Sequence, residues 1–272
     1  MLFSAMSVMV KSLSGVNTFL ITFMRFFTGL AFITTLMLSG VIRIKPKNLP
    51  WLAVRGVFGA MAVMLLYVGI TRIGLGKGTM LNYTYPVFAT LLSPILLKEK
   101  NRPGIWMMQG FAIIGCYLLL NPKGFFHFAP IDLLVLFGGM CAGVAVNSIK
   151  KLTHTDSTYT IFLSFCLFSC LMYGYPAFHH FQPLSISNWI LLVSVGILGT
   201  VGQLSMTYGY KFTPVNEGSI IAFLVPTFNV IIGVLLFSEK MTFGMVLGSI
   251  LIIGCCVYTA LANKGTPSLG GV

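Results

Sequence analysis

Ionisable side chains are scarce in this sequence, and carboxylates are the scarcest of them. Of the 272 residues only 8% are charged, whereas soluble domains carry about 25%. So few charges cannot solvate the surface of a chain of this length, which excludes a water-soluble globule. Because 57% of the residues are hydrophobic, we expect the solvent around the chain to be a lipid bilayer.

The sequence also lacks the residue sets that enzymes and metalloproteins need. It contains five acidic residues, four histidines and six cysteines, and these form no Cys-x-x-Cys motif, Cys/His cluster or nucleophile with a nearby base. We therefore predict no catalytic residues, no metal site and no cofactor. The cysteines all lie in apolar runs, which is typical of small buried side chains.

The net charge of +12 would suggest nucleic acid as a partner of a soluble protein, but in a membrane chain it indicates orientation. Basic residues concentrate in the short cytoplasmic loops of many-pass proteins. If the N-terminus is cytoplasmic, the larger group of basic residues falls on that side: Arg43, Lys45, Lys47, Lys98, Lys100, Arg102, Lys150, Lys151, Lys211 and Lys264. We expect both termini to be cytoplasmic, in a bacterial inner membrane if the source is bacterial.

No long polar linker interrupts the chain, which argues against a separate soluble domain. A membrane span needs about 20 apolar residues, and residues 1–10 would cover only about 15 Å at the helical rise. The remaining candidate spans are 16–39, 51–71, 77–97, 104–120, 130–149, 158–178, 189–210, 214–237 and 243–262. Residues 263–272 form a Gly/Pro/Ser-containing tail that we expect to be flexible.

An internal repeat organises these spans. Shifting the sequence by 140 residues superposes residues 1–104 on 141–244 without a gap. The matches fall on glycine, proline and the Glu-Lys pairs rather than on common apolar residues, which favours true duplication. They include Lys11 with Lys151, Gly56 and Gly59 with Gly196 and Gly199, Gly69 with Gly209, Gly78 with Gly218, Pro86 with Pro226, and Glu99-Lys100 with Glu239-Lys240.

The repeat predicts the architecture: an all-α polytopic membrane protein made of two five-helix repeats. Residues 1–121 form the first repeat and residues 130–262 the second. Because five is odd, the second repeat enters from the opposite face of the membrane, which gives inverted topology, as in many secondary transporters. The first helix is about eleven residues shorter than its repeat counterpart, so we expect it to be truncated.

Several motifs resemble the drug/metabolite transporter superfamily, specifically its EamA-type members. They are Arg25-Phe26-Phe27, Tyr83-Thr84-Tyr85-Pro86-Val87-Phe88, Lys98-Glu99-Lys100, Val225-Pro226-Thr227-Phe228 and Ser238-Glu239-Lys240. The stretch Leu198-Gly199-Thr200-Val201-Gly202-Gln203 is similar to bacterial S-adenosylmethionine uptake carriers. The resemblance implies ten helices, a central cavity between the repeats and alternating access for small organic metabolites.

Arg25 is the clearest candidate for substrate binding, because it lies about nine residues into its helix and so near mid-membrane. An arginine there costs about 2.5–3.5 kcal/mol on insertion scales. A substrate carboxylate would offset that cost, and so would a structural partner. Arg55 and Arg72 lie near opposite ends of one helix, where snorkelling to the membrane surface is the favoured interpretation.

Pro86 and Pro226 fall near the middle of their helices, where each ring breaks the hydrogen-bond ladder. We predict cavity walls on the faces beside these prolines, with Asn82 and Tyr85 in one repeat and Asn229 in the other; the alternative is that the prolines are only gating kinks. Gln203 joins the predicted site, although polar groups at this depth more often bridge helices.

Lys77 and Glu217 occupy equivalent repeat positions with opposite charge, each near a helix start. An acid in the first helical turn complements the helix dipole, so Glu217 has a structural explanation, although it is also the one plausible coupling acid. Lys77 is a cation where cations are disfavoured, which favours a role with substrate or in an ion pair.

These observations predict a secondary transporter of a small organic metabolite. The buried positive charge and the aromatic residues fit a zwitterion such as S-adenosylmethionine, exchanged for S-adenosylhomocysteine; export of amino acids or nucleotide-like metabolites is an alternative. A second class is a non-transporting membrane scaffold or lipid-handling protein, which a dry, packed centre would favour. We expect a small-molecule substrate and the bilayer as partners, no nucleic acid, and a homodimer as one possible assembly.

Overall fold

The computed structural model describes residues 1–98, 103–120, 129–179, 181, 183–237 and 243–264, and throughout these ranges the regular secondary structure is helical. The elements are α1 (Leu2–Ser12), α2 (Thr18–Leu38), α3 (Leu49–Val68), the π-helical turn η1 (Gly69–Ile73), α4 (Leu75–Asn82), α5 (Tyr85–Leu97), α6 (Pro103–Leu120), α7 (Pro130–Leu152), α8 (Thr158–His179), α9 (Ile186–Gly209), α10 (Val215–Ile221), α11 (Leu224–Phe237) and α12 (Phe243–Lys264).

Within these ranges five helices are long and apolar enough to cross a membrane: α2, α3 with η1, α7, α8 and α9. Side-chain oxygens cap the N-termini of α2, α8 and α9: the Asn17 Oδ1 accepts from the Phe19 amide at 2.9 Å, the Ser157 Oγ from the Thr160 amide at 3.2 Å and the Ser185 Oγ from the Asn188 amide at 3.3 Å. Such caps satisfy backbone donors that the helix itself leaves unpaired. Many large apolar side chains stay exposed on the outer faces, as expected where the solvent is lipid.

The fourth helix of each repeat is split in two. In the first repeat α4 ends at Asn82 and α5 begins at Tyr85; in the second, α10 ends at Ile221 and α11 begins at Leu224. The sequence predicts breaks in these helices from Pro86 and Pro226. Pro86 lies in the first turn of α5, where its missing N–H costs no hydrogen bond, so the proline starts a helix after the break.

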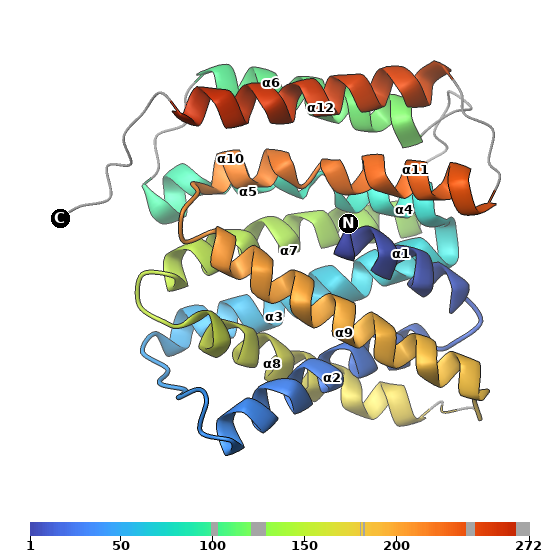
Figure 1. The fold of residues 1–272 in the computed structure, drawn as a ribbon, viewed down its shortest axis with the longest axis vertical. Coiled ribbons are helices and arrows are strands. Elements are labelled where there is room, and N and C mark those ends of the chain that lie inside the picture. The colour runs from blue at the N-terminus through green and yellow to red at the C-terminus, as the bar shows by residue number, and fades with distance from the viewer. Residues whose placement is uncertain (99–102, 121–128, 180, 182, 238–242, 265–272) are drawn as a thin grey trace.

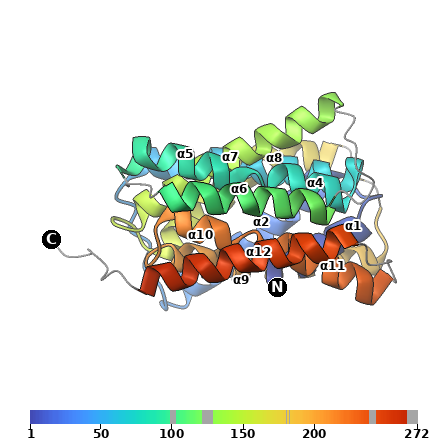
Figure 2. The same ribbon diagram turned by 90° about the horizontal axis from the view of Figure 1, so that it is seen from above.

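Helix contacts repeat when the two halves of the chain are exchanged. α3 contacts α7 and α8, and their counterparts α9, α1 and α2 make the equivalent contacts. Two further pairs, α2 with α8 and α6 with α12, join repeat-equivalent helices. They lie at opposite ends of the molecule in Figure 1, and Figure 2 again shows α6 beside α12. The two repeats are therefore related by a pseudo-twofold axis that passes through both pairs, as in proteins built from inverted repeats.

Glycines allow the closest helix contacts. Gly139 and Gly143 on α7 lie against α5 and the break before it, and a Cβ on Gly143 would lie 2.9 Å from the Ala89 amide nitrogen. Small residues spaced four apart form a helix face that allows such a close approach. Beyond the C-terminal end of α7, the Asp156 carboxylate accepts a hydrogen bond from the Lys47 amide at 2.8 Å, which joins the segment after α7 to the segment before α3.

Candidate functional site

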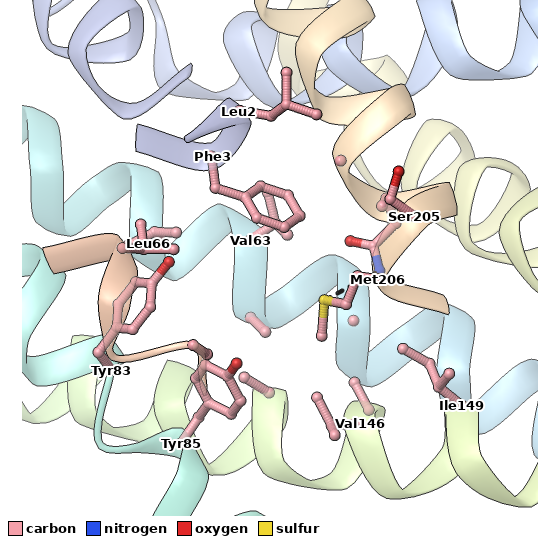
Figure 3. A pocket seen from close by; sticks show the side chains of 18 of the residues that line it. Leu2, Phe3, Val63, Leu66, Tyr83, Tyr85, Val146, Ile149, Ser205 and Met206 are labelled. Carbon is pink, nitrogen blue, oxygen red and sulfur yellow. Dashed lines mark hydrogen bonds between the residues drawn. The ribbon is translucent and has the colours of Figure 1, made fainter. Parts of the chain in front are cut away.

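A cavity of about 560 Å³ lies between the two repeats. Side chains from α1, α3, the α4–α5 break, α7 and α9 surround it in Figure 3. Its lining is mainly apolar, with a few polar groups among methyl, thioether and ring surfaces, which is the usual composition of a small-molecule pocket. The residues labelled in the figure are Leu2, Phe3, Val63, Leu66, Tyr83, Tyr85, Val146, Ile149, Ser205 and Met206.

The cavity extends toward the end of the molecule where α7 and α9 end, because its lining includes Ile149 on α7 and Gly209 on α9. The opposite end, where η1 meets α4, is closely packed. There a Cβ on Gly78 would lie 2.6 Å from the Gly69 carbonyl oxygen. A Cβ on Gly209, the repeat equivalent of Gly69, would meet no atom within 4 Å, so equivalent hairpins of the two repeats are packed differently.

Arg25 lines the cavity, as the sequence predicts. Its side chain is 4% exposed, and its Nη1 donates to the Tyr67 hydroxyl at 3.1 Å. The guanidinium carbon also lies 5.2 Å from the Phe26 ring centroid and 5.7 Å from that of Tyr67. Tyr67 is fully buried and contacts the Met6 sulfur at 3.4 Å through the same hydroxyl. It therefore bridges α3 to α2, the helix-bridging behaviour expected of a polar group at this depth.

Arg55 also lines the cavity, and the snorkelling interpretation is wrong for this residue. Its side chain is 3% exposed and its guanidinium carbon lies 3.7 Å from the Phe165 ring centroid. Gly59, one turn further along α3, leaves the space that the guanidinium occupies. Arg72, by contrast, is exposed in η1, which is consistent with an end-of-helix cation. Position along a helix did not reveal that Arg55 faces inward.

Neither buried guanidinium forms an ion pair with an acid among the described residues. Asp132 caps the start of α7 by accepting from the Ala129 amide, and Asp156 accepts from Lys47. Cation–π contacts are worth about 2 kcal/mol when desolvated, against about 2.5–3.5 kcal/mol for placing an arginine at mid-membrane. The rings thus offset much of the cost of each charge without neutralising it.

The α4–α5 break contributes polar groups to the cavity. Asn82 and Tyr85 both line it, as predicted, and Asn82 is 4% exposed. Pro86 lies behind them, where its carbonyl accepts from the Gln109 side chain of α6 at 2.9 Å. Gln109 also bonds Thr90, so it bridges α6 to α5 and satisfies backbone near the break.

The α10–α11 break of the second repeat contributes different residues to the cavity from those of the α4–α5 break. Ala222 lines the cavity, but Pro226 and Asn229 are absent from its lining. Asn229 is 4% exposed, and neither its amide nitrogen nor its amide oxygen has a hydrogen-bond partner among the described residues. Glu217 lies in the first turn of α10, where the dipole favours an acid, and it too is absent from the lining.

Gln203 lines the cavity from α9, and its amide points to the Met206 sulfur at 3.9 Å. Lys77 lies in α4, but its side chain is outside the described part of the structure. The sequence prediction of the site missed Arg55 and Met206. Two signals could have found Arg55: a glycine four residues later, and the recurrence of that glycine at Gly199 in the second repeat.

Comparison with known proteins agrees with this architecture. A model of the EamA-like transporter family matches residues 1–121 and, a second time, residues 129–261. This chain belongs to the EamA-like transporter family. It is therefore a multi-pass membrane protein of a transporter family, and its cavity lies between the two halves of an EamA-like fold.

Relatives of this EamA-like chain cover most of its length. The pseudopaline exporter CntI of Pseudomonas aeruginosa is 24% identical over 265 residues, covering 97% of this chain and 93% of the relative. Human solute carrier family 35 member G1 is 25% identical over 281 residues, covering 96% and 76%. A solved crystal structure superposes with a TM-score of 0.78 at 21% identity, covering 97% of this chain and 94% of the other, which shows a shared fold.

Proposed function

We propose that this protein is a secondary transporter that carries a small organic metabolite through the central cavity by alternating access. The observation that carries this proposal is the cavity itself, because side chains from both repeats line it. Its volume of about 560 Å³ falls in the range of roughly 300–1,000 Å³ that is typical of small-molecule sites. A non-transporting scaffold would be favoured by a packed centre, and this centre is open.

Inverted repeats supply the physical basis for alternating access, since exchanging the conformations of two related halves moves the opening from one face to the other. The different packing at Gly78 and Gly209 supports a state open at one end. We propose that the open end is cytoplasmic, with both termini on that side of a bacterial inner membrane, because α7 and the α9–α10 turn bring Lys150, Lys151 and Lys211 there.

The substrate proposed from the sequence is a zwitterion such as S-adenosylmethionine, bound by Arg25, Asn82, Tyr85 and Gln203. The name of the Pseudomonas relative gives pseudopaline as its substrate, and the name of the human relative gives none. S-adenosylmethionine as the substrate of this chain therefore remains a prediction. The name of the Pseudomonas relative supports a second candidate, export of a metabolite. Roles for Lys77 and Asn229 in binding, for Glu217 in coupling, and a homodimeric assembly also remain predictions.

Counterflow in proteoliposomes tests the proposal. Vesicles containing the purified full chain would be loaded with an unlabelled amino acid, nucleotide, S-adenosylmethionine or S-adenosylhomocysteine and diluted into the same labelled compound. We expect transient accumulation of label for at least one compound and none in protein-free vesicles. Absence of accumulation for every compound, with the protein shown to be folded in the vesicles, would contradict the proposal for these substrate classes.

A further inference from the structure

Two buried cations line one cavity in this protein. Arg25 comes from α2 and Arg55 from α3, and both side chains are more than nine-tenths buried. Arginine is a cationic side chain, so the cavity wall contains two positive groups. Charges at membrane depth are rare and typically mark substrate pathways.

The surroundings of the two guanidinium groups satisfy part of their hydrogen-bonding capacity. Arg25 donates to Tyr67, and the Nε of Arg55 is buried without a hydrogen-bond partner among the described residues. The rings of Phe26 and Phe165 are in edge contact, with centroids 4.5 Å apart, and each carries one of the two arginines. Each of the two cations therefore contacts one ring of the same aromatic pair, and one ring of that pair, Phe165, lines the cavity.

Glycines shape the protein around both charges. Gly59 leaves space for the Arg55 guanidinium, and a Cβ on Gly199 would lie 2.7 Å from the Arg25 Nε. These glycines are repeat-equivalent, since their numbers differ by 140. Each arginine is thus held against a position where any larger residue would displace it, which indicates a built site for two cations.

We infer that the cavity binds an organic anion, with its carboxylate or phosphate group held by Arg25 and Arg55 and its apolar part against the cavity wall. This inference names the substrate class of the proposed transport site. Binding of the anion does not depend on the proposed function, and only its transport does. Three observations support it: both arginines are buried in the cavity wall, the described lining contains no acid, and the Arg55 Nε has no partner in the described part of the chain. Guanidinium matches carboxylate and phosphate in geometry.

Ligand-induced thermal stabilisation of the purified full chain in detergent tests the inference without requiring transport. The probes are 3-phenylpropanoate, the matched 3-phenylpropanamide and 3-phenylpropylammonium, with phenyl phosphate and inorganic phosphate to separate the two anion types. We expect the organic anions to raise the unfolding midpoint with saturation, and the amide and ammonium compounds to leave it unchanged. Equal stabilisation by amide and carboxylate, or no stabilisation by either organic anion, would overturn the inference.

Variants then assign the anion preference to the two residues. We expect Arg25→Gln and Arg55→Gln each to weaken anion binding about tenfold, and Arg72→Gln, at an exposed cation, to leave it unchanged. If a glutamine variant fails to fold, the matching lysine variant keeps the charge and should keep the preference for anion over amide. Unchanged affinity in both glutamine variants would overturn the assignment. Anion binding without counterflow would contradict only the transport proposal. Counterflow of a screened compound by a protein that the organic anions do not stabilise would contradict only this inference.

Discussion

The guanidinium of Arg55 lies over the ring of Phe165, with 3.7 Å between the guanidinium carbon and the ring centroid. Phe165 occupies in the second repeat the position that Arg25 occupies in the first, 140 residues earlier. At this pair of equivalent positions one repeat thus supplies a cation and the other supplies a ring. The site is therefore asymmetric, although the two repeats that form it are related by a pseudo-twofold axis.

The Arg55–Phe165 contact should be measurable as a coupling. In a double-mutant cycle with Arg55→Met and Phe165→Leu, we expect the two losses of stability to be non-additive by about 1–2 kcal/mol, because the cation–π contact is desolvated. The measurement is the unfolding free energy in mixed micelles. Phe178→Leu, at a 55% exposed ring, is the control for Phe165→Leu. Additive losses would show that the ring and the cation do not interact energetically.

Tyr67→Phe should impair binding while leaving the fold intact. The variant keeps the buried ring but removes the hydroxyl that accepts from Arg25, and hydrogen bonds to charged groups are worth about 1.5–3 kcal/mol. We expect the apparent affinity for anionic probes to fall about tenfold, because Arg25 is no longer held in place. Tyr208→Phe, at an exposed tyrosine on α9, should change nothing. Equal affinity in wild type and Tyr67→Phe would argue against this positioning role.

Gly78→Ala should be severely destabilising, whereas Gly209→Ala should be tolerated. A methyl group on Gly78 would lie 2.6 Å from the Gly69 carbonyl oxygen and 2.8 Å from the Ile70 amide nitrogen, and backbone cannot move aside as a flexible side chain can. Overpacking of this kind costs about 1–3 kcal/mol. The measurement is the unfolding midpoint and the yield of folded protein. Similar midpoints for both variants would contradict the close packing of η1 on α4.

Gln109→Leu should cost about 1–3 kcal/mol of stability, since it removes the donor to the Pro86 carbonyl and to Thr90 in a buried, lipid-surrounded position. The unfolding free energy in mixed micelles measures the loss. Ile114→Ala on the same helix, where the side chain is half exposed, is the control and should cost less. A smaller loss for Gln109→Leu than for the control would mean that the carbonyl finds another donor.

The sequence predicts the helical architecture well because duplication and apolar periodicity are properties of the chain itself. It predicts the inward position of Arg25, Asn82, Tyr85 and Gln203 from depth and helix faces. Asn229 lies outside the cavity lining, because the predicted face ran through a helix that is interrupted at Ala222 and Phe223. Two non-helical residues change the direction in which later side chains face. The prediction fails for Arg55 because the stabilising ring, Phe165, comes from the other repeat.

The most direct test of the central claim is counterflow through a cavity that has been filled. Val146 lines the cavity from α7 and is 4% exposed, so Val146→Trp should occupy the substrate space. Leu133→Trp places the same ring at an outward position on the same helix, where the native side chain is 61% exposed. For a compound that the wild type accumulates, we predict that Leu133→Trp retains counterflow and that Val146→Trp loses it while remaining folded. Counterflow at the wild-type rate in Val146→Trp would contradict transport through this cavity.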